Sequence, residues 1–304
     1  MGIVVIGATF VDIKGYPMHK YIAGGRNAGN IEYVHGGVAR NVAEDIANVE
    51  LRPTFVTLVD ETGAGADVVR KLDKHKVNTS FIKTVPDGMG TWLAIFDNEG
   101  DVCASISKRP DLTEISHIIE EQADEIFKDA TGIVVEIDMD KELNKMIFKY
   151  ADKYNLPVFA LVSNISIAVE RRDFIKQVEC FICNEQEAGV FFADDYTETS
   201  VEDLQVILAR KVKAAGLNKM VITLGERGSV YADKEGNSGF CPAKKVNVMD
   251  TTGAGDAFLA GVTIGITHGK TLAESCEIGT NLSASVIATK DNVCPRFLPE
   301  EFGL

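Results

Sequence analysis

The stretch "DTTGAGDAF", Asp250–Phe258, places three small residues and then an acid at the start of an apolar run, "AFLAGVTIGI". The small residues are Gly253, Ala254 and Gly255, and the acid is Asp256. A helix that begins near Gly253 leaves its first N–H groups without partners inside the helix. Small side chains let an anion approach those groups, and the helix dipole favours negative charge there. The stretch therefore predicts either an anion site or a closely packed helix start.

The acid within this stretch suggests a chemical role. Asp256 would lie in the first turn of the helix, beside the bound anion, where like charges repel. A carboxylate at that place has a use if it accepts a proton from a hydroxyl that attacks phosphorus. The alternative is an acidic residue that stabilises the first turn of the helix. The nonapeptide alone leaves both interpretations open.

Composition and charge limit the class of protein. The chain has 304 residues, 45% hydrophobic and 25% charged, which favours two domains or one large α/β domain. A net charge of -14 argues against nucleic acid or an anionic membrane as partner, but allows a small phosphorylated ligand. No segment approaches the roughly 20 apolar residues of a membrane span. We expect no signal peptide either, because residues 1–15 lack a basic start and a long apolar run.

The cysteines indicate the compartment. Among six scattered cysteines only Cys180 and Cys183 form a CxxC pair, inside the apolar run "VECFICNE". Such a pair could be half of a zinc site or a redox pair. Because there is no second pair and few histidines, we interpret them as reduced cysteines on a strand. This predicts a reducing, cytoplasmic location.

Apolar periodicity predicts the architecture. Strands alternate with helices, most clearly after Asp111, which predicts a mostly parallel sheet covered on both faces. Ligands of such sheets bind beyond the carboxyl ends of the strands. Predicted strands are 3–8, 54–59, 132–138, 157–162, 179–183 and 219–225, with a hairpin at 228–233 and 239–243; predicted helices are 36–49, 65–75, 141–154, 200–216, 253–269 and 272–289, with part of a helix at 174–178.

Two stretches do not fit this layered pattern. Residues 14–35 are rich in Gly, Asn and Tyr, and residues 90–108 contain two alternating runs around Asn98-Glu99-Gly100, a predicted hairpin. We interpret both as a small β lid over the ligand edge of the sheet. No repeat or low-complexity linker is visible, so we predict a single domain, 1–304, with this lid inserted.

Two further motifs follow predicted strands. "TLGERG", Thr223–Gly228, could bend around a nucleotide phosphate, although alone it is more typical of a turn. "NEQE", Asn184–Glu187, has the pattern of an N-cap with a capping box. Its Glu187 could instead orient Mg²⁺ and its waters, because this hard cation takes carboxylates and keeps water.

The N-terminal third holds two candidate sugar contacts. "GGVARN", Gly36–Asn41, pairs two glycines before a helix, where they could cradle a sugar while Asn41 donates to a hydroxyl. Asp12 lies just past the first predicted strand. It could capture two vicinal hydroxyls, or it could be an ordinary loop residue.

As a set, these motifs resemble one family, the PfkB or ribokinase-like carbohydrate and nucleoside kinases. The family's C-terminal signature is "DTTGAGD", present at 250–256, and its N-terminal signature is matched by Gly36, Gly37, Asn41 and Ala43. "NEQE" matches its N-x-x-E motif, and "TLGERG" its T-x-G-x-x-G motif. The order and spacing agree over nearly the whole chain.

The resemblance implies a fold, a reaction and a set of roles. The fold would be a Rossmann-like three-layer α/β sandwich with a β lid, and the reaction phosphoryl transfer from MgATP to a primary hydroxyl. Asp256 would be the base, and Gly253, Ala254 and Gly255 the anion hole. Asp12, Asn27, Gly36, Gly37, Asn41 and Glu136 would bind the acceptor; Asn184, Thr223, Gly225, Gly228 and Asn281 the nucleotide; Glu187 Mg²⁺; and Asp250 and Thr252 a monovalent cation such as K⁺.

Within the family, residues 10–47 resemble the pseudouridine kinase subgroup, which implies transfer to a nucleoside 5′-hydroxyl. Asn27 could pair with a uracil-type edge, because its amide both donates and accepts. Alternatively, Asn27 and Gly29 only form a turn of the lid. A ribokinase- or fructokinase-like sugar kinase and a non-catalytic sugar-binding protein on this fold are the alternatives. Lids of this family often pair across a dimer, so a homodimer through the lid is also implied.

Overall fold

The computed structural model describes residues 2–98 and 102–304. Its centre is a nine-stranded sheet in the order β13-β12-β11-β10-β9-β8-β1-β4-β5. All neighbouring strands are parallel except at one end, where β12 is antiparallel to both of its neighbours, β11 and β13. The strands are β1 Ile3–Ile6, β4 Thr54–Val59, β5 Ile82–Thr84, β8 Gly132–Glu136, β9 Val158–Leu161, β10 Cys180–Asn184, β11 Lys219–Thr223, β12 Ser229–Asp233 and β13 Ser238–Cys241.

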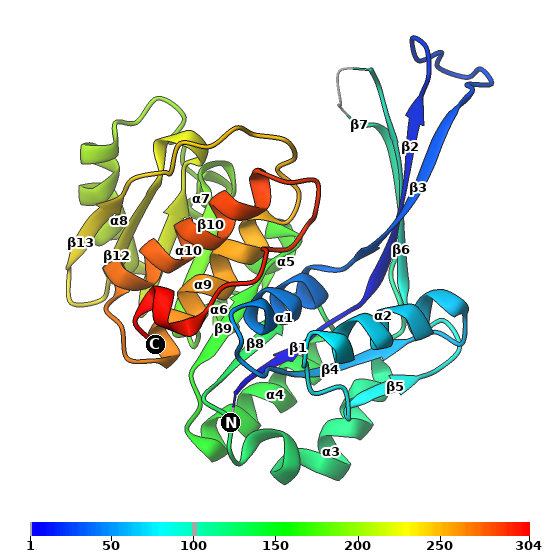
Figure 1. The fold of residues 1–304 in the computed structure, drawn as a ribbon. Helices are drawn as coiled ribbons and strands as arrows, with labels where there is room; N and C mark the ends of the chain where they lie inside the picture. The colour runs from blue at the N-terminus through cyan, green and yellow to red at the C-terminus, as the bar shows by residue number, and fades with distance from the viewer. Residues whose placement is uncertain (1, 99–101) are drawn as a thin grey trace.

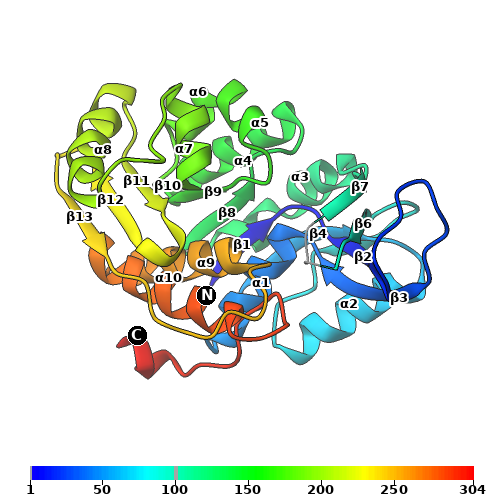
Figure 2. The ribbon, with the colours of Figure 1, turned by 90° about the horizontal axis from the view of Figure 1, so that it is seen from above.

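Helices cover both faces of this sheet, as Figure 2 shows from above. Successive residues of β1 point to opposite faces, so Val4 packs into one apolar core and Val5 into the other. One face carries α1 Val38–Asn48, α2 Gly63–Lys74, α9 Ala254–Thr267 and α10 Leu272–Ile287. The other carries α3 Thr113–Phe127, α4 Lys141–Tyr154, α5 Ile165–Glu170, α6 Arg172–Ile175, α7 Glu185–Phe192 and α8 Val201–Ala215, while short 3₁₀ turns lie at Gly225–Arg227 and Pro299–Phe302. The predicted mostly parallel three-layer α/β class is confirmed.

A second, four-stranded sheet stands apart from the body in Figure 1. Its strand order is β3-β2-β6-β7. Strand β2 begins only a few residues after β1 of the central sheet ends. These strands include both predicted lid segments, although their action as a lid stays a prediction. Of the hairpin turn predicted there, Glu99 and Gly100 lie outside the described residues. The bounds are β2 Phe10–Pro17, β3 Gly29–Gly36, β6 Gly90–Phe96 and β7 Val102–Lys108.

Several local expectations need correction. Asp12 lies inside β2, paired with Val34 and Trp92, and not on a loop after the first strand. The part-helix expected at 174–178 is α6, which ends at Ile175. The first strand ends at Ile6, two residues earlier than expected, and α3, α5 and β5 were not foreseen.

Local chemistry sets where the helices begin and end. Asp140 caps α4 by accepting the N–H of Glu142 at 2.8 Å, and Asn155 ends the helix in the left-handed region. No helix in residues 2–98 and 102–304 is long and apolar enough to cross a membrane.

Candidate active site

Asp256 lies in the first turn of α9, at the carboxyl edge of the sheet. Gly253 begins this helix with φ 84°, and no side chain caps it. A Cβ on Gly253 would stand 2.1 Å from the carbonyl oxygen of Asn292, so only glycine fits there. A Cβ on Gly255 would meet no atom within 4 Å, so this side of the helix start is open. The helix start is therefore free to receive an anion.

A hydrogen bond joins Asp256 to the other end of the chain. Asn41 on α1 donates from Nδ2 to Oδ2 of Asp256 at 2.7 Å. Burial raises the pKa of Asp256 to about 6, although Asn41 and Arg40 act to lower it. The Asp12 carboxylate adds to the rise. A carboxylate with this pKa is ionised at neutral pH and accepts a proton more readily than an ordinary aspartate.

Arg40, which the sequence reasoning did not single out, holds Asn41 in place. Its guanidinium donates to Oδ1 of Asn41, to the carbonyl of His35 at 2.5 Å and to Oε2 of Glu44 at 2.6 Å. Because the Asn41 oxygen is occupied by Arg40, its NH₂ group is the one that faces Asp256. The clue in the sequence is an arginine inside a helix start that is otherwise small and apolar.

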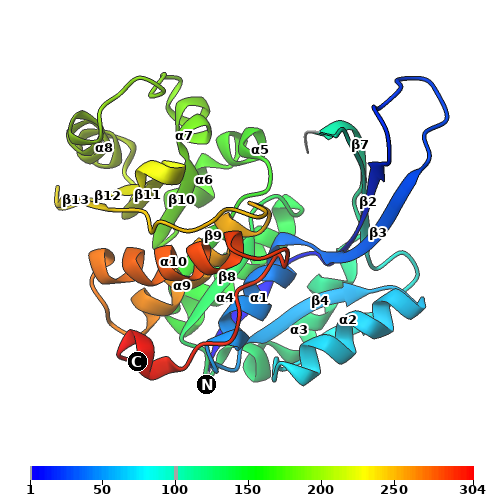
Figure 3. The same cartoon turned by 45° about the horizontal axis from the view of Figure 1, so that its top comes forward.

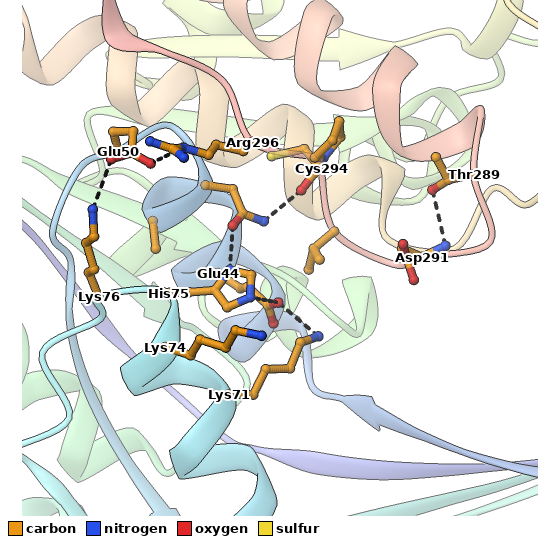
Figure 4. A pocket seen from close by; sticks show the side chains of 14 residues that line it. Glu44, Glu50, Lys71, Lys74, His75, Lys76, Thr289, Asp291, Cys294 and Arg296 are labelled. Atoms are coloured by element: carbon orange, nitrogen blue, oxygen red, sulfur yellow. Dashed lines mark hydrogen bonds and ion pairs between the residues drawn. The ribbon is translucent and has the colours of Figure 1, made fainter.

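Glu44 and its neighbours form the outer end of this network, drawn in Figure 4. Lys71 on α2 lies 2.9 Å from Oε1 of Glu44, and His75 lies farther away at 3.9 Å. Burial alone would raise the pKa of Glu44, but Arg40 and Lys71 outweigh it and hold the pKa below its ordinary value. A chain of charges thus runs from α2 through α1 to Asp256. Its outer end opens into a pocket of about 520 Å³.

Two predicted acceptor-binding glycines allow the second sheet and α1 to approach closely. A Cβ on Gly36 would lie 2.3 Å from Oδ1 of Asp12. Gly37 precedes α1 with φ 93°, and a Cβ there would press on the backbone of residues 8–10. Burial raises the pKa of Asp12, against the lowering effect of Lys14 and Arg40. Asp12, Asn41 and Asp256 are thereby brought to one place.

Glu136, at the end of β8, is nearly fully buried. Its Oε2 accepts the N–H of Ala8 at 2.9 Å. Burial raises the pKa of Glu136 to about 7, Asp138 and Asp256 add to the rise, and Arg109 opposes it. Glu136 therefore lies within electrostatic reach of Asp256 and of the Arg109–Asp138 pair.

Asn27 is occupied by its own loop. Its Oδ1 accepts the N–H of Ile22 at 2.8 Å, and its Nδ2 donates to the carbonyls of Ile22 at 3.0 Å and Gly25 at 3.3 Å. These are the bonds of a turn at the end of the β2–β3 hairpin. Asn27 could donate to a base only by giving up a bond of this turn, whereas its Oδ1 can accept one further hydrogen bond.

The nucleotide motifs meet the start of α9 at one cavity of about 170 Å³. Thr223, Gly225 and Gly228 line it together with Ala254 and Gly255. The predicted Asn184 and Asn281 are not among the lining residues. Side chains on neighbouring elements that also line the cavity, and that sequence reasoning missed, are Ala243, Lys244, Phe258, Thr280, Ser283, Ala284 and Ile287.

The predicted magnesium residue takes part in a capping box. Asn184 accepts the N–H of Glu187 at 2.9 Å, and Oε2 of Glu187 accepts the N–H of Asn184 at 2.8 Å. Within the described ranges no group of three or more His, Cys, Asp or Glu is placed to hold a metal. Glu187 is not among the residues that line the cavity at Thr223, Gly225 and Gly228, so a single carboxylate fits Mg²⁺ only together with substrate phosphates, which this cation commonly takes as ligands.

The residues expected to bind a monovalent cation adjoin the start of α9. Oδ1 of Asp250 accepts the N–H of Thr252 at 2.8 Å. The neighbouring Met249 donates its N–H to the carbonyl of Ile287 at 2.7 Å, which ties this loop to the end of α10. Carboxylate and carbonyl oxygens therefore lie in this region, and these are ligands that suit a hard cation.

An acid at a helix start, beside a cavity lined by glycines, is the arrangement expected of a group-transfer enzyme with anionic substrates. The chain belongs to the pfkB family of carbohydrate kinases, whose model matches residues 2–295. It is 33% identical over 295 residues to guanosine-inosine kinase of Exiguobacterium acetylicum, covering 95% of each chain. It is 26% identical over 287 residues to pseudouridine kinase of Escherichia coli (strain K12), covering 94% of this chain and 90% of the relative.

Solved structures agree on the fold. The structure of Arabidopsis thaliana ribokinase complexed with ribose and ATP has a TM-score of 0.82 to this chain at 19% identity, over 99% of this chain and 97% of that one. The predicted ribokinase-like fold and membership of this kinase family are confirmed.

Proposed function

We propose that the protein transfers the γ-phosphoryl group of ATP to the 5′-hydroxyl of a nucleoside. The observation that carries this proposal is the Asn41–Asp256 pair at the open start of α9, next to the cavity lined by Thr223, Gly225 and Gly228. A base and an anion site side by side are what in-line phosphoryl transfer requires.

The proposed steps use this geometry directly. Oδ2 of Asp256 is held by Asn41, so Oδ1 takes the proton of the acceptor hydroxyl. The hydroxyl oxygen forms a bond to the γ-phosphorus as the bond to the β-phosphate oxygen breaks, and ADP leaves. The N–H groups at the start of α9 stabilise the charge on the transferred group. Mg²⁺, with Glu187 as its proposed protein partner, would neutralise the phosphate charges.

The inner face of the second sheet favours a nucleoside over a free sugar. Tyr16 and Phe96 stack at 4.9 Å, and Trp92 meets Phe96 edge-on at 6.3 Å. These strands also carry Asp12, which faces the base Asp256. Aromatic rings beside a sugar site offer the apolar cover that an acceptor larger than a free sugar needs. Closure of this sheet as a lid would also exclude water and limit wasteful ATP hydrolysis.

The identity of the nucleoside has two candidates. Pseudouridine is supported by the resemblance of residues 10–47, although Asn27 is used by its own loop. A 6-oxopurine nucleoside is supported by the higher identity to a relative named for guanosine and inosine. We favour the 6-oxopurine nucleoside, and pseudouridine remains the second candidate.

An acceptor panel with MgATP tests the proposal. Release of ADP would be measured with guanosine, inosine, adenosine, pseudouridine, uridine, ribose and fructose, and the product located by NMR. We expect a nucleoside 5′-monophosphate from the best acceptor. Higher kcat/KM for a free sugar than for every nucleoside would contradict the nucleoside assignment, and no turnover with any acceptor would favour a non-catalytic binding protein. Omission of K⁺ from the buffer tests the cation site proposed at Asp250 and Thr252.

A further inference from the structure

A third cavity, of about 330 Å³, lies where the second sheet meets the end of β8. Phe10 of β2 lines one side, Arg109 directly after β7 lines another, and Glu136 and Asp138 at the end of β8 close it. Its volume is within the range of small-molecule sites. None of the roles assigned above uses Arg109, Asp138 or the cavity itself.

Arg109 is held over this cavity by a buried acid. The Asp138 side chain has no exposed surface, and its Oδ2 lies 3.5 Å from the Arg109 guanidinium and accepts the hydroxyl of Ser163 at 2.6 Å. Oδ1 of Asp138 has no hydrogen-bond partner among the described residues. Burying a carboxylate in this way is costly unless a fixed cation compensates it. Asp138 therefore positions Arg109, whose side chain is about half exposed and retains donors for a ligand.

The cavity adjoins the proposed acceptor site at Ala8 and Glu136. Ala8 and Glu136 line it, and the same two residues are joined by a hydrogen bond beside the acceptor-binding group. Asp256 raises the pKa of Glu136 and Arg109 lowers it, so both groups lie within electrostatic reach of Glu136. A sugar placed with its 5′-hydroxyl at Asp256 and its ring near Glu136 would direct its C1′ substituent toward Arg109.

We propose that this cavity holds the base of the acceptor nucleoside, and that Arg109 reads the O6 and N7 acceptors of a 6-oxopurine. This inference rests on the proposed nucleoside kinase function. A guanidinium is a rigid fork of donors that matches two adjacent acceptors. Adenine places an amino donor where O6 would be, and uracil-type bases lack the N7 acceptor. Arg109 therefore selects 6-oxopurines over adenine and over pyrimidines.

The test compares acceptors in matched variants. In the unmodified protein we expect kcat/KM for inosine and guanosine to exceed that for adenosine and pseudouridine by roughly ten- to a hundredfold, the range of one bidentate contact. Arg109→Lys should lose most of that preference, because an ammonium cannot bind both acceptors at once. Lys108→Gln is the matched control: it removes a cation one residue away, which pairs with Asp87 at 2.7 Å and does not line the cavity.

Two readouts separate this idea from a folding defect and from the proposed function. Calorimetric affinity for a non-hydrolysable ATP analogue should be unchanged in Arg109→Lys, and the affinity for guanosine should fall without any need for turnover. A preference for adenosine or pseudouridine in the unmodified protein, or an unchanged preference for inosine in Arg109→Lys, would overturn the assignment. If no nucleoside is phosphorylated, the proposed function fails, while an Arg109-dependent guanosine affinity would still support the base cavity.

Discussion

Asp256 is an acid that its surroundings make into a stronger base. Burial beside Asp12 raises its pKa, while the amide of Asn41 fixes the position of one oxygen. The first prediction concerns the carboxylate itself. Asp256→Asn should lower kcat by at least roughly a hundredfold, because it removes the general base. ATP affinity and the thermal transition should be retained, as measured by calorimetry, and near-normal turnover would remove Asp256 from the mechanism.

The pH dependence follows from the same residue. Because the pKa of Asp256 is raised to about 6, the group is protonated and inactive below that pH. We expect kcat/KM to rise with pH and to level off above a midpoint near 6. Asn41→Ala should move this midpoint to higher pH, because the hydrogen bond from Asn41 lowers the pKa. Glu136, with a pKa of about 7, could produce a similar rise of kcat/KM with pH. The pH profile of kcat/KM is therefore also measured in Glu136→Gln.

Arg40 acts on the base through Asn41. Arg40→Lys keeps the charge but cannot reach Asn41, Glu44 and the carbonyl of His35 together. We expect kcat to fall about ten- to a hundredfold through misplacement of Asn41, with little change in KM for ATP. The midpoint of the pH profile should move to higher pH, as in Asn41→Ala but by less, because the hydrogen bond from Asn41 is weakened while the positive charge at position 40 stays. Lys74→Gln, an exposed change on α2, is the control, and a KM effect without a kcat effect would argue against positioning.

At the scale of elements, the start of α9 depends on one glycine. Gly253 combines φ 84° with a 2.1 Å approach of the Asn292 carbonyl to any Cβ, whereas Gly269 has φ 76° but open space around it. Gly253→Ala should therefore displace the first turn and lower kcat strongly. Gly269→Ala should cost only the backbone strain of roughly 1–2 kcal/mol, with normal kinetics. Equal kinetic effects of the two variants would contradict an active role for this helix start.

The elements also show what a sequence can predict. Helices such as α4 and strands such as β4 were predicted almost to the residue, because their periodicity and caps are local. The helix α3 carries the same signal in Ile115, Ile118 and Ile119 and was nevertheless missed. The strand β5, with three residues, is too short to show a period.

The candidate site also contains residues that could be predicted from the sequence and residues that could not. Asp256 and the residues around it were predicted, because an acid beside small residues at a helix start is a local pattern. The roles of Arg40 and Arg109 were not predictable, because each depends on a partner that only the fold brings near. Asn281 lies next in sequence to Thr280, which lines the cavity beside the start of α9, and its contact with the nucleotide stays a prediction.

At the scale of the molecule, the outer face of the second sheet is apolar and exposed. Tyr33 is 72% exposed, Ile106 70% and Ile31 65%. Register places Tyr33 opposite Ile13 and Ile106 opposite Leu93, on the side away from Asp12. A contiguous apolar surface of this kind is typical of an interface. We propose that two copies pair through it.

This pairing gives the last prediction. Light scattering should show a dimer, and Tyr33→Asp combined with Ile106→Asp should give a monomer, because two buried like charges would face each other. Val206→Asp, an equally apolar exposed position on α8, should leave the dimer intact. A monomeric unmodified protein, or a double variant that remains dimeric, would rule out this interface.

The bond between Asn41 and Asp256 joins residues 215 positions apart. The segment after α10 then runs back beside α1, as Figure 3 shows, where Asn292 donates to His35 at 2.9 Å and Cys294 donates to Asp45 at 2.6 Å. During synthesis on the ribosome, Asn41 is made long before Asp256. The segment that carries Asn292 and Cys294 follows later still. A nascent chain that has not reached Asp256 therefore lacks the Asn41–Asp256 pair, and with it the base proposed for phosphoryl transfer.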